Sequence, residues 1–189
     1  MDQKTTNKGK TNASKVVTAA VGGLVVGLMA NAGRKVVIQM MDSTYGAWDD
    51  ILRAEHDATL LIFDKLQETG PDHPTKRSML LLQLKHALTK HALEEENVVY
   101  PAMRENGLVE EADALNKDHG YVKQFLYELS KMEPSDREWG TRVAEFRREI
   151  ETHQREEENT LFPQLREKMD VEANTALTAA LNKEGVMAA

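Results

Sequence analysis

Two short segments of the chain pair a histidine with a glutamate four residues later, a spacing that suits a metal ion. The pairs are His91 with Glu95 and His153 with Glu157. Residues four apart on a helix lie about 40° from each other around its axis, so an imidazole nitrogen and a carboxylate oxygen can reach one ion. A single pair of this kind is usually a surface ion pair, so it is the repetition of the pattern that favours a metal site.

Both pairs lie inside an internal repeat. Residues 91–105 read HALEEENVVYPAMRE and residues 153–167 read HQREEENTLFPQLRE, with eight of the fifteen aligned positions identical. His56 and His119 correspond at an offset of 63, against 62 for the longer motif. The chain therefore contains two copies of a helix pair, and such a duplication can place equivalent residues on opposite sides of one central site.

Apolar residues that recur every three or four positions, between segments rich in Gly, Pro and Asn, indicate long helices. We expect four of them, over about residues 45–68, 74–105, 108–132 and 135–168, with a short tail helix over 171–184. No alternating strand pattern competes in this part of the chain. Short turns between long helices predict an all-α fold, an antiparallel up-down-up-down four-helix bundle.

Several local features of these helices can also be predicted. Asp72 is placed to cap the second helix, and Ser135 with Glu138 forms a capping-box pattern at the start of the fourth. Pro101 and Pro163 should kink the second and fourth helices beyond the candidate ligands, because proline cannot donate a backbone hydrogen bond.

Each of the four helices carries one histidine that should face the interior of the bundle. Two of these begin the paired motifs, and the other two lie on the apolar stripes of the first and third helices. Burying four imidazoles and two carboxylates in a small bundle is very costly unless a cation neutralises them. The predicted metal ligands are His56, His91, Glu95, His119, His153 and Glu157.

The chemistry of this ligand set narrows the choice of metal. The chain has no cysteine, which excludes thiolate metal sites, iron–sulfur clusters and disulfides. Imidazole mixed with carboxylate suits iron, manganese or zinc. Two carboxylates that can bridge, with two histidines on each side, suit a pair of ions.

Over about residues 47–168 the chain resembles the haemerythrin-like, or HHE cation-binding, domain. The resemblance rests on the order of these six residues and on the Glu-Glu-Glu-Asn segment in each copy of the repeat. The resemblance implies a four-helix bundle that holds two non-haem iron ions, with manganese or zinc as alternatives. Members of this family bind or sense dioxygen, nitric oxide or reactive oxygen species, handle iron, or help to repair iron–sulfur centres.

We therefore expect a metal-binding protein that binds or senses a small diatomic molecule or peroxide, or that handles iron. The alternatives at the same site are an oxidoreductase that consumes peroxide or nitric oxide and an iron–sulfur repair protein. A metal-free helical interaction protein is a third hypothesis. The sequence contains no nucleotide-binding loop or fused output domain. The first two hypotheses therefore differ only in whether the metal site turns over its small molecule. We favour binding or sensing.

Some positions depart from the family pattern or could extend it. Oxygen-carrying haemerythrins have a second histidine in the third helix where this chain has Lys123, and a more widely spaced aspartate where it has Glu157. A site with fewer ligands leaves an open coordination position, which favours small-molecule reactivity over reversible carriage. His73 is a candidate for the fifth histidine of some relatives, although its Pro-rich turn favours a solvated side chain. His86 should lie at a surface or an interface.

Residues beside the predicted ligands have less specific interpretations. Four glutamates could hydrogen-bond to the ligands or remain solvated, namely Glu94, Glu96, Glu156 and Glu158. Of these, Glu94 and Glu156 are expected to lie nearer the site. Tyr127 could approach the site but is expected to pack in the core.

The charge of the chain is divided unevenly. The net charge is −7, yet residues 1–41 hold six Lys or Arg against one Asp, while residues 42–189 hold eighteen against thirty Asp or Glu. The acidic balance argues against a nucleic-acid partner. We interpret residues 1–41 as a basic, apolar leader, residues 42–169 as the metal-binding bundle and residues 170–189 as a C-terminal tail.

The apolar segment 16–33 within this leader has three interpretations. It could be the core of a signal peptide, a short membrane helix, or a packing segment in which Ala19, Gly23 and Gly27 allow close approach. We favour packing, either as self-association into a homo-oligomer or as docking on a membrane surface. We therefore expect a cytoplasmic protein that could be membrane-associated, or an exported one if residues 1–32 are a signal peptide.

Overall fold

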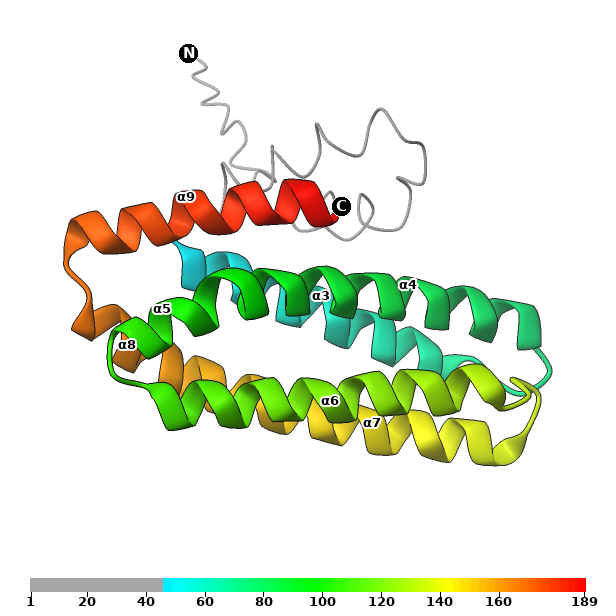
Figure 1. Cartoon of the computed structure of the whole chain (residues 1–189). Coiled ribbons are helices and arrows are strands. Elements are labelled where there is room, and N and C mark those ends of the chain that lie inside the picture. Colours follow the sequence, from blue (N-terminus) through cyan, green and yellow to red (C-terminus); the bar gives the residue numbers. More distant parts are fainter. Residues whose placement is uncertain (1–45) are drawn as a thin grey trace, which may run out of the picture.

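The structure, a computed structural model, describes residues 46–189, and these form a bundle of helices without a strand. The long helices are α3 (Trp48–Glu68), α4 (Pro74–Glu94), α6 (Val109–Lys131) and α7 (Arg137–Glu156). Figure 1 shows them lying side by side, with each helix running opposite to the one before it. The predicted all-α, up-down-up-down bundle is confirmed.

A polar layer divides the interior of the bundle into two apolar cores. The first core includes Trp48, Leu52, Met103, Leu115 and Phe162. The second, toward the α3–α4 and α6–α7 turns, includes Phe63, Leu84, Leu129, Trp139 and Phe146. Burying a side chain of this size stabilises a fold by about 1.5–3 kcal/mol, so the two cores can offset the cost of the polar layer between them.

The second and fourth long helices end in π-helical turns rather than in simple kinks. These are η1 (Glu95–Val99), which leads into α5 (Tyr100–Glu105), and η2 (Glu157–Leu161), which leads into α8 (Phe162–Lys168). In each turn the last N–H bonds to a carbonyl five residues back. The wider turn relieves the clash between a proline ring and the carbonyl four residues before it, so the turn forms just ahead of each proline.

The predicted helix caps are displaced by one residue. His73 is the N-cap of α4 and makes no side-chain capping bond, so the cap expected from Asp72 is not formed. At α7 it is Asp136, not Ser135, whose carboxylate accepts the N–H of Glu138 at 3.0 Å. This helix begins one residue later than the capping-box pattern indicates, which brings the aspartate to the capping position.

A fifth long helix, α9 (Val171–Ala188), packs against the bundle instead of trailing from it. Figure 1 shows it lying along the α3 and α4 side of the bundle. The indole N–H of Trp48 donates to the side chain of Asn174 at 2.9 Å, and Thr178 accepts the backbone N–H of Trp48 at 3.1 Å. The helix expected over 171–184 is therefore present, longer than predicted and attached to the start of α3.

The interpretations of segment 16–33 lie outside the described residues, so signal, membrane and packing roles all stay predictions, as does the division of the chain into leader, bundle and tail. Among residues 46–189, none of the helices combines the length and hydropathy that a bilayer crossing requires.

Candidate metal centre

The structure brings the six predicted ligands together in the polar layer between the two cores. All six side chains are buried, and those of Glu95 and Glu157 are 0% exposed. Each of these glutamates begins a π-helical turn, one turn of helix beyond its histidine. Their juxtaposition follows from the bundle, whereas their role as metal ligands stays a prediction that rests on the geometry of these side chains.

One half of the site is built around His56 and His91, and we call it the His56 half. The Nε2 atoms of the two histidines face each other at 3.0 Å. Oε2 of Glu95 lies 3.3 Å from Nε2 of His91, and Oε2 of Glu157 lies 3.5 Å from Nε2 of His56. Ligand atoms of these four residues all lie within 4.8 Å of one another, close enough to surround a single ion.

The other half, which we call the His119 half, contains His119 and His153, whose ring centroids are 5.2 Å apart. Oε2 of Glu95 lies 3.2 Å from Nε2 of His119, and Oε1 of Glu157 lies 3.3 Å from Nε2 of His153. Each glutamate therefore approaches a histidine of both halves. The two carboxylates lie where the bridging ligands of a pair of ions would lie.

Several buried atoms of the site have no hydrogen-bond partner among the described residues. They are Oε1 of Glu95, Oε2 of Glu157 and both ring nitrogens of His153. A buried polar atom left unpaired costs about 1–3 kcal/mol, and such atoms are rare in native proteins. Lone pairs of carboxylate oxygen and imidazole nitrogen are what a transition-metal cation accepts, so these side chains fit a metal centre.

The protonation of the site without metal reflects crowding of like charges. Burial raises the pKa of the Glu157 carboxyl well above its ordinary value, and the charge of Glu95 raises it further. Burial also opposes charge on Glu95 and His91, but these two attract each other, so the pKa of Glu95 falls and that of His91 rises. Without metal, the Glu157 carboxyl therefore keeps a proton, and a bound cation would take the place of that proton.

A carboxylate lies against the outer nitrogen of each histidine in the His56 half. Oε1 of Glu158 is 2.7 Å from Nδ1 of His56, and Oε2 of Glu55 is 3.0 Å from Nδ1 of His91. When Nδ1–H donates a hydrogen bond to the carboxylate, the Nε2 of a neutral imidazole presents its lone pair to the interior of the site. The two Nε2 atoms face each other at 3.0 Å, so without metal one of them must carry a proton and donate it to the other, and a cation would take the place of that proton.

The His119 half repeats this arrangement from the other copy of the repeat. Oε1 of Glu96 lies 2.9 Å from Nδ1 of His119, and Oδ2 of Asp118 lies 3.7 Å from Nδ1 of His153, an ion-pair distance longer than a hydrogen bond. The dipeptides 55–56 and 118–119 therefore each supply an inward histidine and a carboxylate that faces the histidine of another helix. Outer partners of this kind fix the ring orientation of metal-binding histidines.

The expectation that Glu94 and Glu156 lie nearer the site than Glu96 and Glu158 was wrong for Glu156, but it was correct in part for Glu94, which is buried close to His91. Glu96 and Glu158 contact the histidines, whereas Glu94 binds Lys90 at 2.5 Å and Glu156 is exposed. A π-helical turn advances by a smaller angle per residue than an α-helix, so the residue after each ligand glutamate stays nearer the inward face. A regular helix, which was the basis of the expectation, would have turned it away.

Behind the His56 half, Lys90 joins two carboxylates. Its ammonium group bonds to both Glu55 and Glu94. Burial opposes the charge of Glu55, but the bond to His91 and the charge of Lys90 lower its pKa to about 2. Burial and the neighbouring Glu55 raise the pKa of Glu94 to about 8. Glu55 is thus kept ionised and can accept a hydrogen bond from Nδ1 of His91.

Tyr100 belongs to the site although the sequence reasoning did not select it. Its side chain is 1% exposed, and its hydroxyl lies 3.0 Å from Nε2 of His119 and 3.3 Å from carboxylate oxygens of both Glu95 and Glu157. Burial, together with the two carboxylates, raises the pKa of this phenol well above its ordinary value. Its repeat counterpart is Phe162, and this difference inside an otherwise matching motif is the signal that could have identified it.

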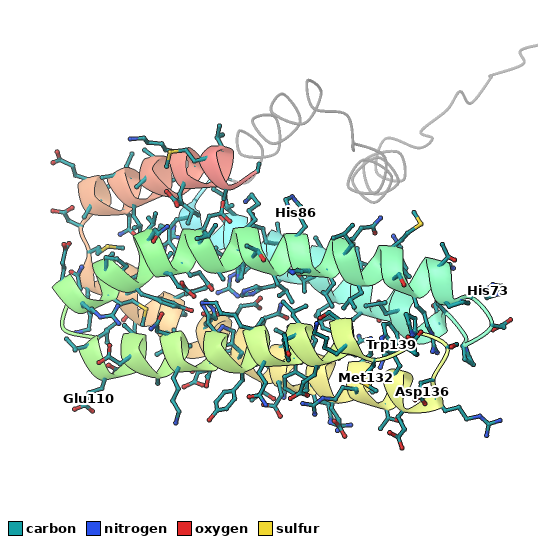
Figure 2. All side chains as sticks on the ribbon, turned by 45° about the vertical axis from the view of Figure 1, so that its right-hand side comes forward. His73, His86, Glu110, Met132, Asp136 and Trp139 are labelled. Carbon is teal, nitrogen blue, oxygen red and sulfur yellow. The ribbon has the colours of Figure 1, made fainter. Side chains whose placement is uncertain are left out.

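Other residues considered from the sequence lie away from the ligands. The side chain of His73 is 64% exposed, in the turn that Figure 2 shows at one end of the bundle, which agrees with a solvated turn residue rather than a fifth ligand. His86 lies on the outer side of α4 and is exposed. Tyr127 is 63% exposed, so the expected core packing was wrong. Lys123 binds Glu96 at 3.0 Å.

Comparison with known proteins gives a family match and one partial relative. The family model of the Hemerythrin HHE cation binding domain matches residues 49–165, which span the four long helices and the six predicted ligands. A protein of Nostoc sp. (strain PCC 7120 / SAG 25.82 / UTEX 2576) named DNA nickase is 29% identical over 123 residues, which cover 65% of this chain but 34% of the relative. The chain thus spans about a third of that curated relative. No solved structure gives a significant match.

Proposed function

Because the chain belongs to the hemerythrin HHE cation-binding domain family, we propose that it is a non-haem di-iron protein that binds or senses dioxygen, nitric oxide or peroxide. Family membership and the His and Glu clusters establish a metal-binding domain. The number and identity of the ions and the nature of the small molecule are the proposed part.

One observation carries the proposal: Glu95 and Glu157 each lie between the two histidine pairs. Both carboxylates are fully buried, and each retains an oxygen without a hydrogen-bond partner. Two ions, each with two histidines and shared carboxylates, would satisfy every one of these atoms. Imidazole and carboxylate together suit iron well, and manganese or zinc remain the chemical alternatives.

The residues of the chain would prepare such a centre to bind a small molecule. A pair of iron ions would supply redox chemistry and an open coordination position. Glu55, Glu96 and Glu158 orient the imidazoles through their outer nitrogens. The two apolar cores on either side of the polar layer exclude bulk water, and this strengthens every charge interaction inside the site.

A second candidate function is an oxidoreductase that consumes peroxide or nitric oxide at the same centre. The buried hydroxyl of Tyr100, 3.0 Å from His119, favours it because a phenol can hold and donate a proton at Oη beside a bound oxidant. Iron handling and iron–sulfur repair stay within the proposal as further family roles. We do not extend DNA nicking to this chain, because the match covers 34% of the nickase and the net charge of −7 disfavours a nucleic-acid partner.

Metal analysis of protein purified without a histidine tag tests the proposal directly. After anaerobic loading we expect about two iron ions per chain, as the two histidine pairs require. Fewer than one ion per chain would contradict both the sensing and the enzymatic versions. Stopped-flow mixing of the loaded protein with peroxide then separates them, because many turnovers per centre would favour the oxidoreductase.

Variants locate the iron within the chain. His91→Ala and His153→Ala should each remove most of the bound iron, since each deletes a ligand from a different half of the site. His86→Ala is the matched control, because this histidine lies on α4 but on its exposed side. Iron content and ultraviolet charge-transfer absorption that survive in both ligand variants would mean that the ligand assignment is wrong.

A further inference from the structure

Two cavities beside α4 and α6 share part of their lining and touch the candidate metal centre. The outer cavity has a volume of about 90 Å³, and the inner one about 20 Å³. Both are lined by Leu88, Ala92, Val122 and His119. The inner cavity also touches His153 and His91, so both histidines of the His119 half line the cavities, against one histidine of the His56 half.

The walls of the outer cavity are mainly apolar. They include Leu88, Ala92 and Leu93 from α4, with Val122 and Leu126 from α6. An ion or a strongly hydrated molecule that entered would exchange water for hydrocarbon, which is unfavourable. A small uncharged molecule pays almost nothing for the same transfer, so the walls select by charge as well as by size.

The internal repeat indicates why the space lies beside these helices. Ala92 corresponds to Gln154 of α7, and Leu126 corresponds to Phe63 of α3, at offsets of 62 and 63. Both counterparts are buried, and both are larger side chains. Larger side chains at the alanine and leucine positions would occupy part of the space between α4 and α6.

An ion pair lies at the mouth of the outer cavity. Nζ of Lys123 is 3.0 Å from Oε1 of Glu96, and the same oxygen is 2.9 Å from Nδ1 of His119. The Lys123 side chain is 66% exposed. Exposed ion pairs contribute little to stability, so this one can open readily. The mouth is neutral overall and offers no net attraction to an anion.

From these features we infer that the α4–α6 cavities are the entry route for an uncharged diatomic molecule, which binds at the His119 half of the site. This inference rests on the proposed function and narrows it, because apolar walls favour dioxygen or nitric oxide over anions and over hydrogen peroxide, which is uncharged but strongly hydrated. A cavity needs about 10–15 Å³ to hold one water molecule, so volumes of about 90 Å³ and 20 Å³ admit molecules of a few atoms and exclude larger substrates.

The first test measures the rate of nitric oxide binding to the ferrous, iron-loaded protein by stopped flow. Ala92→Phe, which places a ring in both cavities, should slow association by about tenfold or more, equivalent to about 1.4 kcal/mol on the barrier. Ala114→Phe is the matched control, because Ala114 is exposed on α6 and lines neither cavity. Equal rates in both variants would overturn the route. Repeating the measurement with dioxygen shows which of the two molecules forms the stable complex.

The second test needs neither a variant nor iron. Xenon is uncharged and enters apolar cavities, so crystals of the unmodified protein under xenon pressure should bind it between α4 and α6. No xenon there would overturn the inference even if the iron-loaded protein binds nitric oxide. If xenon binds in the cavity but the iron-loaded protein binds neither gas, the proposed function is contradicted, while the cavity is still shown to accept a small uncharged guest.

Discussion

The hydroxyl of Tyr100 lies 3.0 Å from Nε2 of His119, a contact that has no equivalent in the other half of the site. The repeat counterpart of Tyr100 is Phe162, whose ring stacks on His56 with centroids 6.2 Å apart. The two halves therefore offer different surroundings to two ions that would otherwise be related by the repeat. With a phenol beside the His119 half and a phenyl ring beside the His56 half, an ion held by His119 would have an oxygen ligand within reach that an ion held by His56 would lack.

Replacing Tyr100 tests this asymmetry. Tyr100→Phe removes this difference between the two halves and should preserve most of the iron, because the six predicted ligands remain. If the phenol binds ferric iron, the oxidised wild-type protein has a phenolate charge-transfer band in the visible spectrum, and the variant lacks it. Tyr127→Phe, at a 63% exposed position, controls for loss of a tyrosine elsewhere. A visible band retained by Tyr100→Phe would contradict direct ligation.

The outer carboxylates provide a second prediction. Glu158→Gln and Glu96→Gln keep the size of each side chain but remove the charge that orients His56 and His119. Loss of such a partner typically weakens metal binding by about 10–100-fold, and we expect that range here in competition titrations with a chelator. Glu156→Gln, at an exposed neighbouring position, should leave affinity unchanged. A similar loss in all three variants would indicate a general charge effect instead.

The raised pKa values of His91 and Glu157 predict that iron binding releases protons. In the metal-free protein both groups retain protons at pH values where they would ordinarily lose them. For Glu157 the causes are burial and the charge of Glu95. For His91 burial acts in the opposite direction, but the attraction of Glu95 and Glu55 outweighs it. Metal binding requires both groups without those protons, so affinity should rise with pH. Calorimetric titrations in buffers of different ionisation enthalpy should report release of about one to two protons per chain. Release of none would contradict the prediction.

Close packing of α9 over the His56 half predicts a difference between two helical glycines. A Cβ added at Gly185 would lie 2.2 Å from Oε1 of Glu94 and 3.1 Å from Nζ of Lys90, so a buried ion pair must shift. A Cβ at Gly120 meets nothing within 4 Å.

Gly185→Ala should therefore lower the free energy of unfolding by about 1–3 kcal/mol, as overpacking usually does. Gly120→Ala should raise it by about 0.5–1 kcal/mol, because alanine favours a helix. Urea denaturation measures both. Stabilisation by both substitutions would show that α9 does not pack closely on Lys90 and Glu94.

Much of the fold and the candidate ligand set could be predicted because both depend on regular spacing. Apolar residues at helical intervals define which face of each helix is buried, and the six predicted ligands lie on those faces. The flanking residues could not be predicted in the same way. Glu96 and Glu158 reach the histidines through π-helical turns, and a reading based on regular α-helices selected Glu94 and Glu156 instead.

By itself, the sequence determined the all-α bundle, the duplicated motif and the identity of the six side chains that meet at its centre, because helical periodicity and internal repetition are properties of the chain alone. Only the tertiary structure decided how the two halves differ. Tyr100 reaches His119, and space remains beside Ala92, since these relationships depend on how side chains from separate helices fill one interior. Close packing across helices has no fixed spacing along the chain, so it emerges only when the helices come together.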